Sequence, residues 1–486
     1  MTFPIEERSQ ERDGPRDECG VFGIFAPGRE VARLAYFALY ALQHRGQESA
    51  GIATAPLRGN IMALRDQGLV AQVFDEHKLR SLPGDMAIGH VRYSTTGSSD
   101  WENTQPIVRG DRRELALAHN GNLINAVELH AELRERGVAF ASTSDSEIIA
   151  ALLATHPAER IEDAVADVLP RLKGAFSTVV MTDDAVVAFR DPHGLRPLAL
   201  GVMEGGDGPP AYTVASESCA LDLIGARYLR EVYPGEVVTL TDGGFRTRVV
   251  AGSERHAFCI FEYIYFARPD SRMSGTVLQV ARGKMGEHLW HEAPVEADLV
   301  IPVPDSGNPA ARGLARAAGL PQDDGFIKNR YVARTFIQPG QELRKQGLRL
   351  KFNPLPEVVS GKRLIVVDDS IVRGNTTRQI VQMLRDAGAA EIHLRISAPP
   401  IKHPCHYGID MSTREEMIAH GRSVEEVAAE LGTDSLHYLS LEGVYAAVGA
   451  SRDTHCDACF TGEYPLAGTE EEANGKYAFE LPLAPA

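Results

Sequence analysis

Short apolar runs bounded by glycine dominate the first half of the chain, and helical patterns interrupt them. Order is predicted to begin with an apolar strand at Cys19–Phe25, and apolar residues at mixed three and four spacing predict a helix over Val31–Leu42. Further helices are predicted at Ala126–Arg136 and Ser146–Leu153. Six more short strands are predicted, over Ala87–Val91, Leu115–Ala118, Ser177–Met181, Ala185–Phe189, Tyr212–Ser216 and Glu236–Leu240. Strand groups with interspersed helices are typical of an α+β unit with stacked or mixed sheets.

The pattern of apolar residues changes after Gly252, where predicted apolar strands alternate with predicted helices. The predicted order is strand, helix, strand, helix, strand, over Asp298–Pro302, Pro309–Ala318, Arg363–Val367, Thr376–Ala387 and Glu391–Ser397. This spacing predicts βαβ units in a parallel sheet. We therefore predict a boundary near residue 255, which separates a first domain over 19–255 from a second over 256–465. A charged leader over 1–18 precedes them, and a mobile tail over 466–486 follows.

Composition narrows the class of protein. The 486 residues contain 50 Lys and Arg against 66 Asp and Glu, a formal charge of −16, which argues against nonspecific binding of nucleic acid. No apolar run approaches the roughly 18 residues that a membrane-spanning helix needs. The leader lacks the apolar segment of a signal peptide, so we expect a cytoplasmic protein. Six cysteines are too few for a disulfide scaffold.

The clearest chemical pattern lies at the end of the predicted strand Arg363–Val367. Asp368 and Asp369 follow this strand directly, and a turn with Gly374 then enters the next helix. Backbone N–H groups at a helix N-terminus attract anions, and glycine lets the backbone approach a phosphate closely. Neighbouring residues of a strand face opposite sides, so one carboxylate can hold Mg²⁺ while the other binds ribose hydroxyls. A plain parallel strand with an acidic end, or a receiver domain, is the alternative interpretation.

The stretch 364–377 resembles the signature of the type I phosphoribosyltransferases, which bind phosphoribosyl pyrophosphate. The resemblance implies a parallel α/β domain with one Mg²⁺ held by Ser306, Asp368 and Asp369. It implies that the substrate is bound by Asp368, Asp369, Ser370, Val372, Arg373, Gly374, Asn375, Thr376 and Thr377. Between the ends of the predicted strands Asp298–Pro302 and Arg363–Val367 lies a basic loop, Lys328–Ile337. In this family the loop closes over the substrate. Its cations Lys328, Arg330 and Arg334 could bind a pyrophosphate leaving group. The alternative is a solvent-exposed cationic loop without a binding role.

A cysteine begins the first predicted strand, and motifs farther along the chain accompany it. Together they resemble the class II glutamine amidotransferases, and they occur over Cys19–Ile24, Gln43–Gly51, Gly89–Thr95, Ala118–Leu123 and Thr143–Glu147. The resemblance implies the αββα sandwich of the N-terminal-nucleophile hydrolases. It implies Cys19 as nucleophile, with Asn120 and the Gly121 N–H holding the oxyanion. Arg92 and Asp145 would bind the glutamine α-carboxylate and α-ammonium. A single such match is weak, since a lone cysteine is more often a small buried apolar residue.

Cys19 is not the second residue, so removal of the initiator methionine cannot expose it. A free α-amine on Cys19, with a pKa near about 8, would supply the base that the thiol needs. We therefore expect residues 1–18 to be a propeptide that is cleaved autocatalytically between Glu18 and Cys19.

The remaining cysteines suggest a metal centre. Cys456 and Cys459 form a pair spaced for chelation, while Cys259 and Cys405 lie far away in sequence. A redox dithiol or a chance spacing is possible for the pair alone, and a [4Fe–4S] cube or a four-cysteine zinc site fits all four equally well. The contexts of these cysteines resemble one branch of the amidophosphoribosyltransferase family, and this resemblance implies a [4Fe–4S] cluster as a structural centre. Cys219 is assigned to packing.

Both halves together closely resemble the amidophosphoribosyltransferase family, from Cys19 to about Pro465. The resemblance implies that glutamine yields ammonia, which displaces pyrophosphate from phosphoribosyl pyrophosphate to give 5-phosphoribosylamine, the first committed step of purine synthesis. It also implies ammonia transfer between two sites, closure of the loop Lys328–Ile337, inhibition by purine nucleotides, and a homotetramer. The alternatives are another amidotransferase, such as a glucosamine-phosphate synthase, which leaves the Asp368–Asp369 loop unexplained, and a non-catalytic nucleotide sensor.

Overall fold

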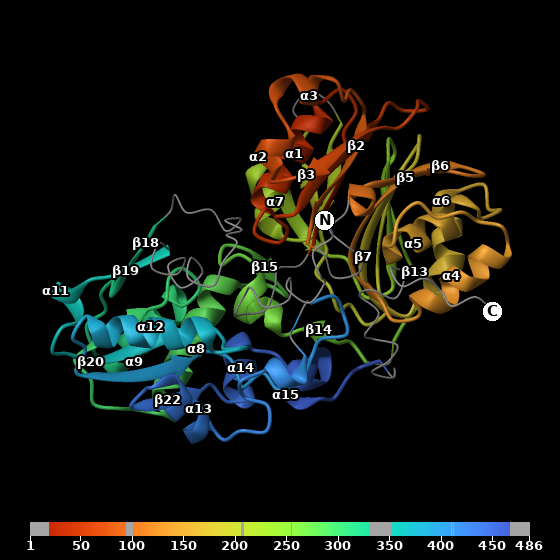
Figure 1. Cartoon of the computed structure of the whole chain (residues 1–486). Coiled ribbons are helices and arrows are strands. Elements are labelled where there is room, and N and C mark those ends of the chain that lie inside the picture. The colour runs from red at the N-terminus through yellow and green to blue at the C-terminus, as the bar shows by residue number, and fades with distance from the viewer. Residues whose placement is uncertain are drawn as a thin grey trace, which may run out of the picture.

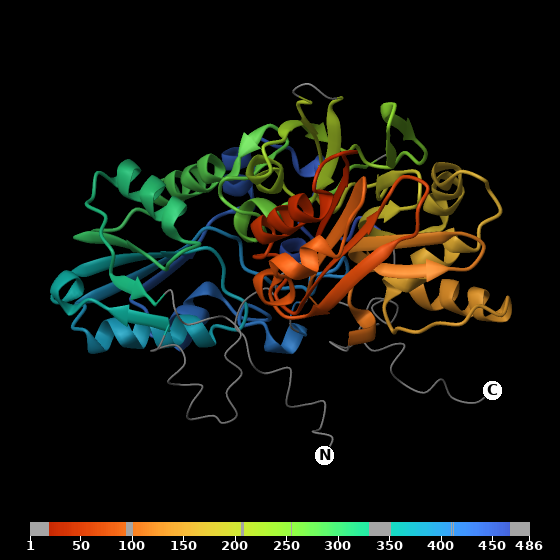
Figure 2. The same cartoon turned by 90° about the horizontal axis from the view of Figure 1, so that it is seen from above.

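The computed structural model describes residues 19–93, 101–205, 209–253, 255–329, 351–409, 411 and 413–466. Within these residues two units lie side by side, one built on antiparallel sheets and the other on a parallel sheet (Figures 1 and 2). The predicted propeptide, Arg330, Arg334 and residues 467–486 of the predicted tail lie outside the described residues.

A seven-stranded antiparallel sheet forms one inner layer of the first unit. Its strands, in spatial order, are β11 (Arg227–Glu231), β9 (Ala199–Met203), β10 (Ala211–Ala215), β1 (Gly20–Phe25), β4 (Met86–Arg92), β2 (Ser49–Ala55) and β3 (Met62–Gln67). β1 lies centrally between β10 and β4, and every residue of β1 is buried. The start of β1 is therefore held in a fixed place by two neighbouring strands.

A six-stranded antiparallel sheet forms the second inner layer. Its order is β13 (Gly244–Val249), β12 (Glu236–Thr241), β8 (Val186–Arg190), β7 (Gly174–Met181), β6 (Glu114–Leu123) and β5 (Ile107–Gly110). Apolar side chains from both sheets meet in one core cluster that includes Val21, Ile88, Val179, Val214 and Leu240. This burial of alternate strand residues holds the two sheets face to face.

Helices cover both outer faces of this pair of sheets (Figure 1). One outer cluster is formed with α1 (Val31–Ala41), α2 (Val70–Val73), α3 (Glu76–Arg80) and α7 (Ser218–Leu223). The other is formed with α4 (Ala126–Glu135), α5 (Asp145–Ala154) and α6 (Ile161–Val168). The layer order is therefore αββα, which confirms the sandwich that the resemblance implied.

The second unit contains a four-stranded parallel sheet in the order β17 (Leu299–Pro302), β20 (Arg363–Asp368), β21 (Glu391–Ile396) and β22 (Ser435–Tyr438). Helices α8 (Leu278–Glu292), α9 (Asn308–Ala318) and α14 (Leu441–Val448) pack together, and α12 (Asn375–Asp386) packs against α13 (Val424–Leu431). A small hairpin of β18 (Phe326–Lys328) and β19 (Phe352–Pro354) precedes α11 (Pro356–Val359). The predicted βαβ arrangement is confirmed.

Segments distant in sequence meet where the two units join. β14 (Phe258–Cys259) pairs in parallel with β23 (His455–Cys456), which precedes α15 (Ala458–Thr461). Immediately after β14 comes a π-helical turn, η4 (Glu262–Phe266), followed by the small hairpin of β15 (Arg272–Met273) and β16 (Thr276–Val277). Single π-turns of this kind occur frequently at functional sites.

Strand β6 is longer than the sequence pattern predicted. The apolar run Leu115–Ala118 ends before His119 and Asn120, yet the strand continues to Leu123 because its backbone pairs with β7 as far as Gly174. Backbone pairing depends on the neighbouring strand, so polar side chains do not end it. Within the described residues no helix combines the length and apolarity needed to cross a bilayer.

Close packing of α8 on α9 generates a stability prediction. A methyl group at Gly286 would stand 1.8 Å from the Ala310 carbonyl oxygen, whereas one at Gly283 would have only the Pro309 oxygen near it, at 3.9 Å. We expect Gly286→Ala to destabilise this unit by about 1–3 kcal/mol through overpacking. The control Gly283→Ala, in the same helix, is expected to be neutral or stabilising by up to about 1 kcal/mol. Urea unfolding followed by circular dichroism measures both, and equal midpoints would contradict this packing.

Candidate functional site

Cys19 lies directly before β1 and beside the end of β4. Gly20 pairs with Val91, which places Cys19 next to Arg92, and the thiol donates to the Tyr93 carbonyl oxygen at 3.3 Å. Burial raises the pKa of the thiol to about 11, while the charges of Arg92, Glu48 and Asp145 also act on it. The thiol is therefore protonated at pH 7 and needs a base to become a nucleophile.

Asn120 and Gly121 lie inside β6, paired with Ser177 and Phe176 of β7. Asn120 is only 1% exposed, and its side-chain nitrogen has no hydrogen-bond partner among the described residues. Gly121 has φ +153°, and a methyl group there would stand 1.9 Å from the Ala175 carbonyl oxygen. Buried donors are normally hydrogen-bonded, so the Asn120 amide suits an acceptor supplied by a ligand, such as an oxyanion.

Asp145 begins α5 and is buried, at 3% exposure. Its carboxylate accepts a hydrogen bond from the Leu123 N–H at 2.9 Å, and one oxygen lies 3.8 Å from His119 Nδ1. Because Asp145 acts electrostatically on Cys19, the structure brings together four predicted elements of a glutamine site: Cys19, Arg92, Asp145 and the β6 strand.

His90 and His119 stabilise the two sheets. His90 Nε2 lies 3.0 Å from the His119 carbonyl oxygen, and His119 Nδ1 lies 3.0 Å from Ser146 Oγ. Burial lowers the pKa of His90 to about 3 and also lowers the pKa of His119. Both rings are too weakly basic to deprotonate Cys19, and their contacts indicate a structural role.

The second site lies at the carboxyl end of β20. Asp368 and Asp369 are both buried, and the Asp369 N–H donates to an Asp368 carboxylate oxygen at 2.9 Å. Hydroxyls of Ser306 and Ser370 bond to Asp369. Burial raises the pKa of both carboxyls, and for Asp368 the neighbouring charge of Asp369 raises it further. Such a pair of buried carboxylates with hydroxyls beside it matches the oxygen ligands that Mg²⁺ prefers.

A glycine turn leads from these carboxylates into α12. Gly374 precedes the helix with φ +80°, and a side chain there would meet Ile418 at 2.3 Å. Arg373 pairs with Glu416 at 2.9 Å, while the side chain of Val372 is buried, so Val372 presents only its backbone to a ligand. The remaining predicted binding residues lie in the first turn of the helix, Asn375 exposed, Thr376 half-buried and Thr377 buried.

Lys328 ends β18 and forms an ion pair with Asp305, next to Ser306 in the turn after β17. The structure thus brings Lys328 to the same strand ends as Asp369. The structure does not describe Arg330 and Arg334, so their predicted roles stay predictions.

The four predicted cluster cysteines gather at the junction of the two units. Cys259 and Cys456 are partners in the β14–β23 pair, Cys459 lies in α15, and the charges of Cys259, Cys456 and Cys405 all act on Cys459. Burial raises the pKa of Cys456 to about 12. Among described residues, no three or more His, Cys, Asp and Glu side chains are placed to hold a single metal ion.

Comparison with known proteins matches both units. Residues 90–222 match the glutamine amidotransferase domain and residues 275–407 match the phosphoribosyl transferase domain. An amidophosphoribosyltransferase of Synechococcus elongatus is 50% identical over 476 residues, covering 97% of this chain and 96% of that protein. The Bacillus subtilis amidophosphoribosyltransferase is 48% identical over 461 residues, covering 94% and 95%.

The chain belongs to the amidophosphoribosyltransferase family.

Solved structures agree with this assignment. The B. subtilis glutamine phosphoribosylpyrophosphate amidotransferase complexed with ADP and GMP superposes with a TM-score of 0.86 at 47% identity, covering 92% of this chain and 97% of that chain. A structure described as the allosteric regulatory enzyme of purine biosynthesis gives a TM-score of 0.88, also at 47% identity, covering 93% and 97%. The family, the two kinds of domain and the enzyme class that the resemblance implied are confirmed. The synthase and sensor alternatives are therefore not supported.

Contacts between the two units were not predicted from sequence. Arg196 of the amidotransferase unit donates to the Tyr407 carbonyl oxygen at 2.9 Å, and Asn122 of β6 donates to the His406 oxygen at 3.1 Å. Gly408 has φ +97°, and a methyl group there would stand 3.0–3.2 Å from backbone atoms of Gly121. The segment that follows Cys405 therefore packs on the predicted oxyanion site. The one sequence feature connected with this contact is Gly408, and a single glycine does not indicate a function by itself.

Gly408→Ala tests whether this packing positions the glutaminase site. We expect glutaminase activity to fall about 10- to 100-fold because Gly121 must shift, while ammonia-dependent pyrophosphate release stays within about twofold. The control Gly449→Ala is also at a glycine with positive φ, +75°, but its methyl group meets nothing within 4 Å. Equal glutaminase rates for the two variants would show that the contact does not position Gly121.

Proposed function

We propose that the processed chain hydrolyses glutamine at Cys19 and passes ammonia to phosphoribosyl pyrophosphate bound at Asp368–Thr377. The observation that carries this proposal is the buried Asn120 amide without a described partner, in the same unit as a thiol that Arg92 and Asp145 influence. A ligand that supplies an oxyanion, a carboxylate and an ammonium satisfies all three side chains at once. Glutamine undergoing attack on its side-chain amide has these groups.

In the proposed first step, the Cys19 sulfur attacks the glutamine amide carbon while the thiol proton moves to the α-amine. The tetrahedral oxyanion accepts hydrogen bonds from Asn120 and the Gly121 N–H. Ammonia leaves with that proton, and water then hydrolyses the thioester to glutamate and the free thiol. Arg92 and Asp145 hold the α-carboxylate and α-ammonium, which distinguishes glutamine from other amides.

The α-amine in this step requires removal of the propeptide 1–18. A buried thiol with its pKa near about 11 has no described side chain nearby that is basic enough, because both histidines of the sheets have lowered pKa values. A new amino terminus on Cys19, with a pKa near about 8, fills that role. Cleavage between Glu18 and Cys19 is therefore part of the proposal.

In the proposed second step, ammonia attacks the anomeric carbon of the ribose and pyrophosphate leaves. Ser306, Asp368 and Asp369 would hold Mg²⁺, which when bound offsets the charge of the pyrophosphate. Lys328 adds a cation at the same strand ends, and the turn at Gly374 presents backbone N–H groups to the 5-phosphate. Ammonia must reach this site without contacting bulk water, where it would be protonated and lose its lone pair.

Cys259, Cys405, Cys456 and Cys459 would hold a [4Fe–4S] cluster. Three buried thiols and the half-buried thiol of Cys405 form a soft donor set, and the charges of the other three act on Cys459. Cysteine thiolates are the ligands that iron–sulfur clusters take in proteins, so these four residues would suit such a group. When bound, the cluster supplies a structural crosslink between β14, β23 and the Cys405 segment that packs on Gly121.

Partners of the enzyme complete the proposal. The related B. subtilis structure contains ADP and GMP, which supports purine nucleotides as feedback inhibitors of this chain. A homotetramer and a cytoplasmic location stay predictions from sequence.

Half-reactions measured separately test the function. We expect pyrophosphate release from phosphoribosyl pyrophosphate with either glutamine or ammonium as nitrogen donor. Cys19→Ala should lower the glutamine-dependent rate by about 10³-fold or more, because no nucleophile remains, and should leave the ammonium-dependent rate within about twofold. Asp369→Asn should lower both rates by about 10²-fold or more.

Two measurements on the same preparations serve as controls. The intact mass of active enzyme should correspond to a chain that begins at Cys19, and a fully active protein that retains residues 1–18 would overturn the processing step. Glutamine-dependent turnover by Cys19→Ala at the normal rate would overturn the assignment of the nucleophile.

The cluster is tested by metal analysis of protein purified without oxygen. We expect about four irons and four acid-labile sulfides per chain, with broad visible absorption, and loss of thermal stability once oxygen destroys the cluster. Cys459→Ser should prevent assembly, whereas Cys219→Ser, at a buried cysteine outside the set, should leave the iron content unchanged. A colourless, fully active enzyme with stoichiometric zinc would contradict the cluster.

A further inference from the structure

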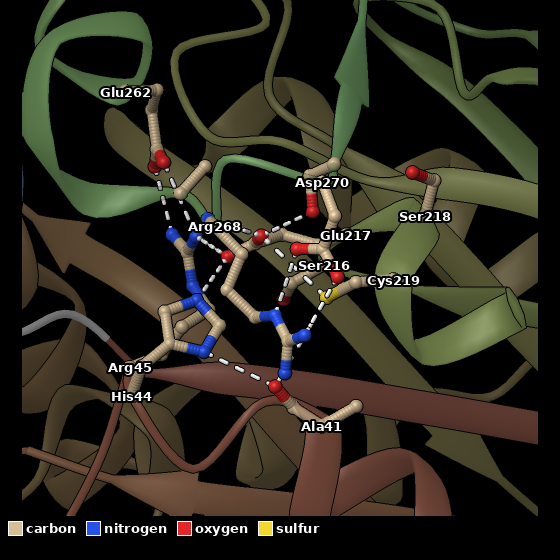
Figure 3. A network of polar contacts seen from close by, with 12 residues as sticks. Ala41, His44, Arg45, Ser216, Glu217, Ser218, Cys219, Glu262, Arg268 and Asp270 are labelled. Atoms are coloured by element: carbon tan, nitrogen blue, oxygen red, sulfur yellow. Dashed lines mark hydrogen bonds and ion pairs between the residues drawn. The ribbon is translucent and has the colours of Figure 1, made fainter. Parts of the chain in front are cut away.

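A buried guanidinium lies between the two units, directly behind the nucleophile. Arg45, in the loop after α1, donates from Nε to the Cys19 carbonyl oxygen at 3.1 Å. Its terminal nitrogens bond to Glu217 at 2.6 Å and to Glu262 at 2.7 and 3.1 Å (Figure 3). All three charged side chains have zero exposure.

The two carboxylates come from different units. Glu217 precedes α7 of the amidotransferase unit, whereas Glu262 begins η4 of the phosphoribosyltransferase unit. Glu217 also accepts hydrogen bonds from the Arg268 N–H and the Ser271 hydroxyl across the junction, at 2.9 and 2.6 Å. Burial of Glu217 would raise its pKa, but the charges of His44 and Arg45 outweigh this effect and lower it, so the group stays ionised.

The turn that begins at Glu262 is held from its other side by Arg282 of α8. This arginine is 3% exposed and donates to the carbonyl oxygens of Tyr263 at 2.8 Å and Ala267 at 2.7 Å. The charge of Asp369, in the predicted substrate site, acts on the Arg282 guanidinium. Two arginines therefore bind this turn. Arg45 binds the Glu262 side chain and the Cys19 carbonyl oxygen, whereas Arg282 binds backbone oxygens of the turn and is subject to the charge of Asp369.

We propose that Glu262 is a positioning residue that transmits the state of the phosphoribosyl pyrophosphate site to Cys19, through its ion pair with Arg45 and through Arg282 behind the same turn. The inference rests on the function proposed above and adds to it a physical path for coupling. Substrate and its cation change the charge balance around Asp369, which alters the pull on Arg282 and hence the position of η4. A displacement of Glu262 moves Arg45 through their ion pair, and Arg45 in turn moves the Cys19 carbonyl group through its hydrogen bond.

Such a path satisfies the physical requirement for coupling between sites. A ligand shifts a distant site only if it interacts differently with two arrangements of the intervening structure. Ion pairs of buried groups give discrete arrangements, because an unpaired buried charge is costly. The π-turn, whose carbonyls bind Arg282, is a backbone segment that can repack without breaking a long helix.

The test is Glu262→Gln in the full-length processed enzyme, which keeps the shape and removes the charge. In the unmodified enzyme, phosphoribosyl pyrophosphate should stimulate glutamate formation. In the variant we expect this stimulation ratio to fall about fivefold or more, within the usual range of allosteric coupling. Basal glutaminase activity, ammonium-dependent pyrophosphate release and the KM for phosphoribosyl pyrophosphate should stay within about twofold.

Asp270→Asn is the matched control, because it removes a carboxylate at the same junction that pairs with Arg268 while more than half exposed. Its stimulation ratio should be unchanged. Arg282→Lys is a second variant in case Glu262→Gln folds poorly. It keeps the charge but loses the pair of hydrogen bonds to the backbone of this turn, so its stimulation ratio should also fall.

A normal ratio in both Glu262→Gln and Arg282→Lys would overturn the path, and so would a parallel fall of both half-reactions, which indicates a merely structural role. An unmodified enzyme that hydrolyses glutamine and transfers ammonia without any stimulation would overturn the path alone. An unmodified enzyme with neither half-reaction would overturn the proposed function instead.

Discussion

The buried guanidinium of Arg45 joins the backbone of Cys19, the proposed nucleophile, to carboxylates of both units. Paired charges in an interior of low polarity are costly to separate, so this contact fixes the relative position of the two units. That constraint matters for the proposed chemistry, because ammonia released at Cys19 would be useful only if the acceptor site lies at a defined place nearby. The αββα sandwich and the parallel sheet supply the two sites, and the junction relates them.

A second contact across the junction acts on the oxyanion side of the same site. Asn122 and Arg196 bind carbonyl oxygens of His406 and Tyr407, and Gly408 packs on Gly121. Cys405, a proposed cluster ligand, directly precedes these residues. The structural role proposed for the cluster is therefore local: it would hold the segment that supports β6, not take part in electron transfer.

Burial raises the pKa of titratable groups at both sites, with a different consequence at each. It keeps the Cys19 thiol protonated, and in the proposed mechanism a base created by processing would activate this thiol. It raises the pKa of Asp368 and Asp369, so that these carboxyls favour a partner cation. The proposed processing would supply a base for the thiol, and the proposed Mg²⁺ would supply a cation for the two carboxyls.

The sequence alone determined the elements and most of the chemistry. Apolar patterns located α1, β20 and α12 to within a residue or two, because the two helices bury one face each and the strand is buried on both faces. Motifs singled out Cys19, Asn120 and the Asp368–Asp369 pair as candidate site residues, since the expected chemistry demands particular residue types in a fixed local order, and their roles stay predictions. The tertiary structure decided the full length of β6, the meeting of Cys259 with Cys456, and the pairing of Arg45 with Glu262. Those contacts join residues far apart in the chain, and no local pattern specifies a partner that only folding brings near.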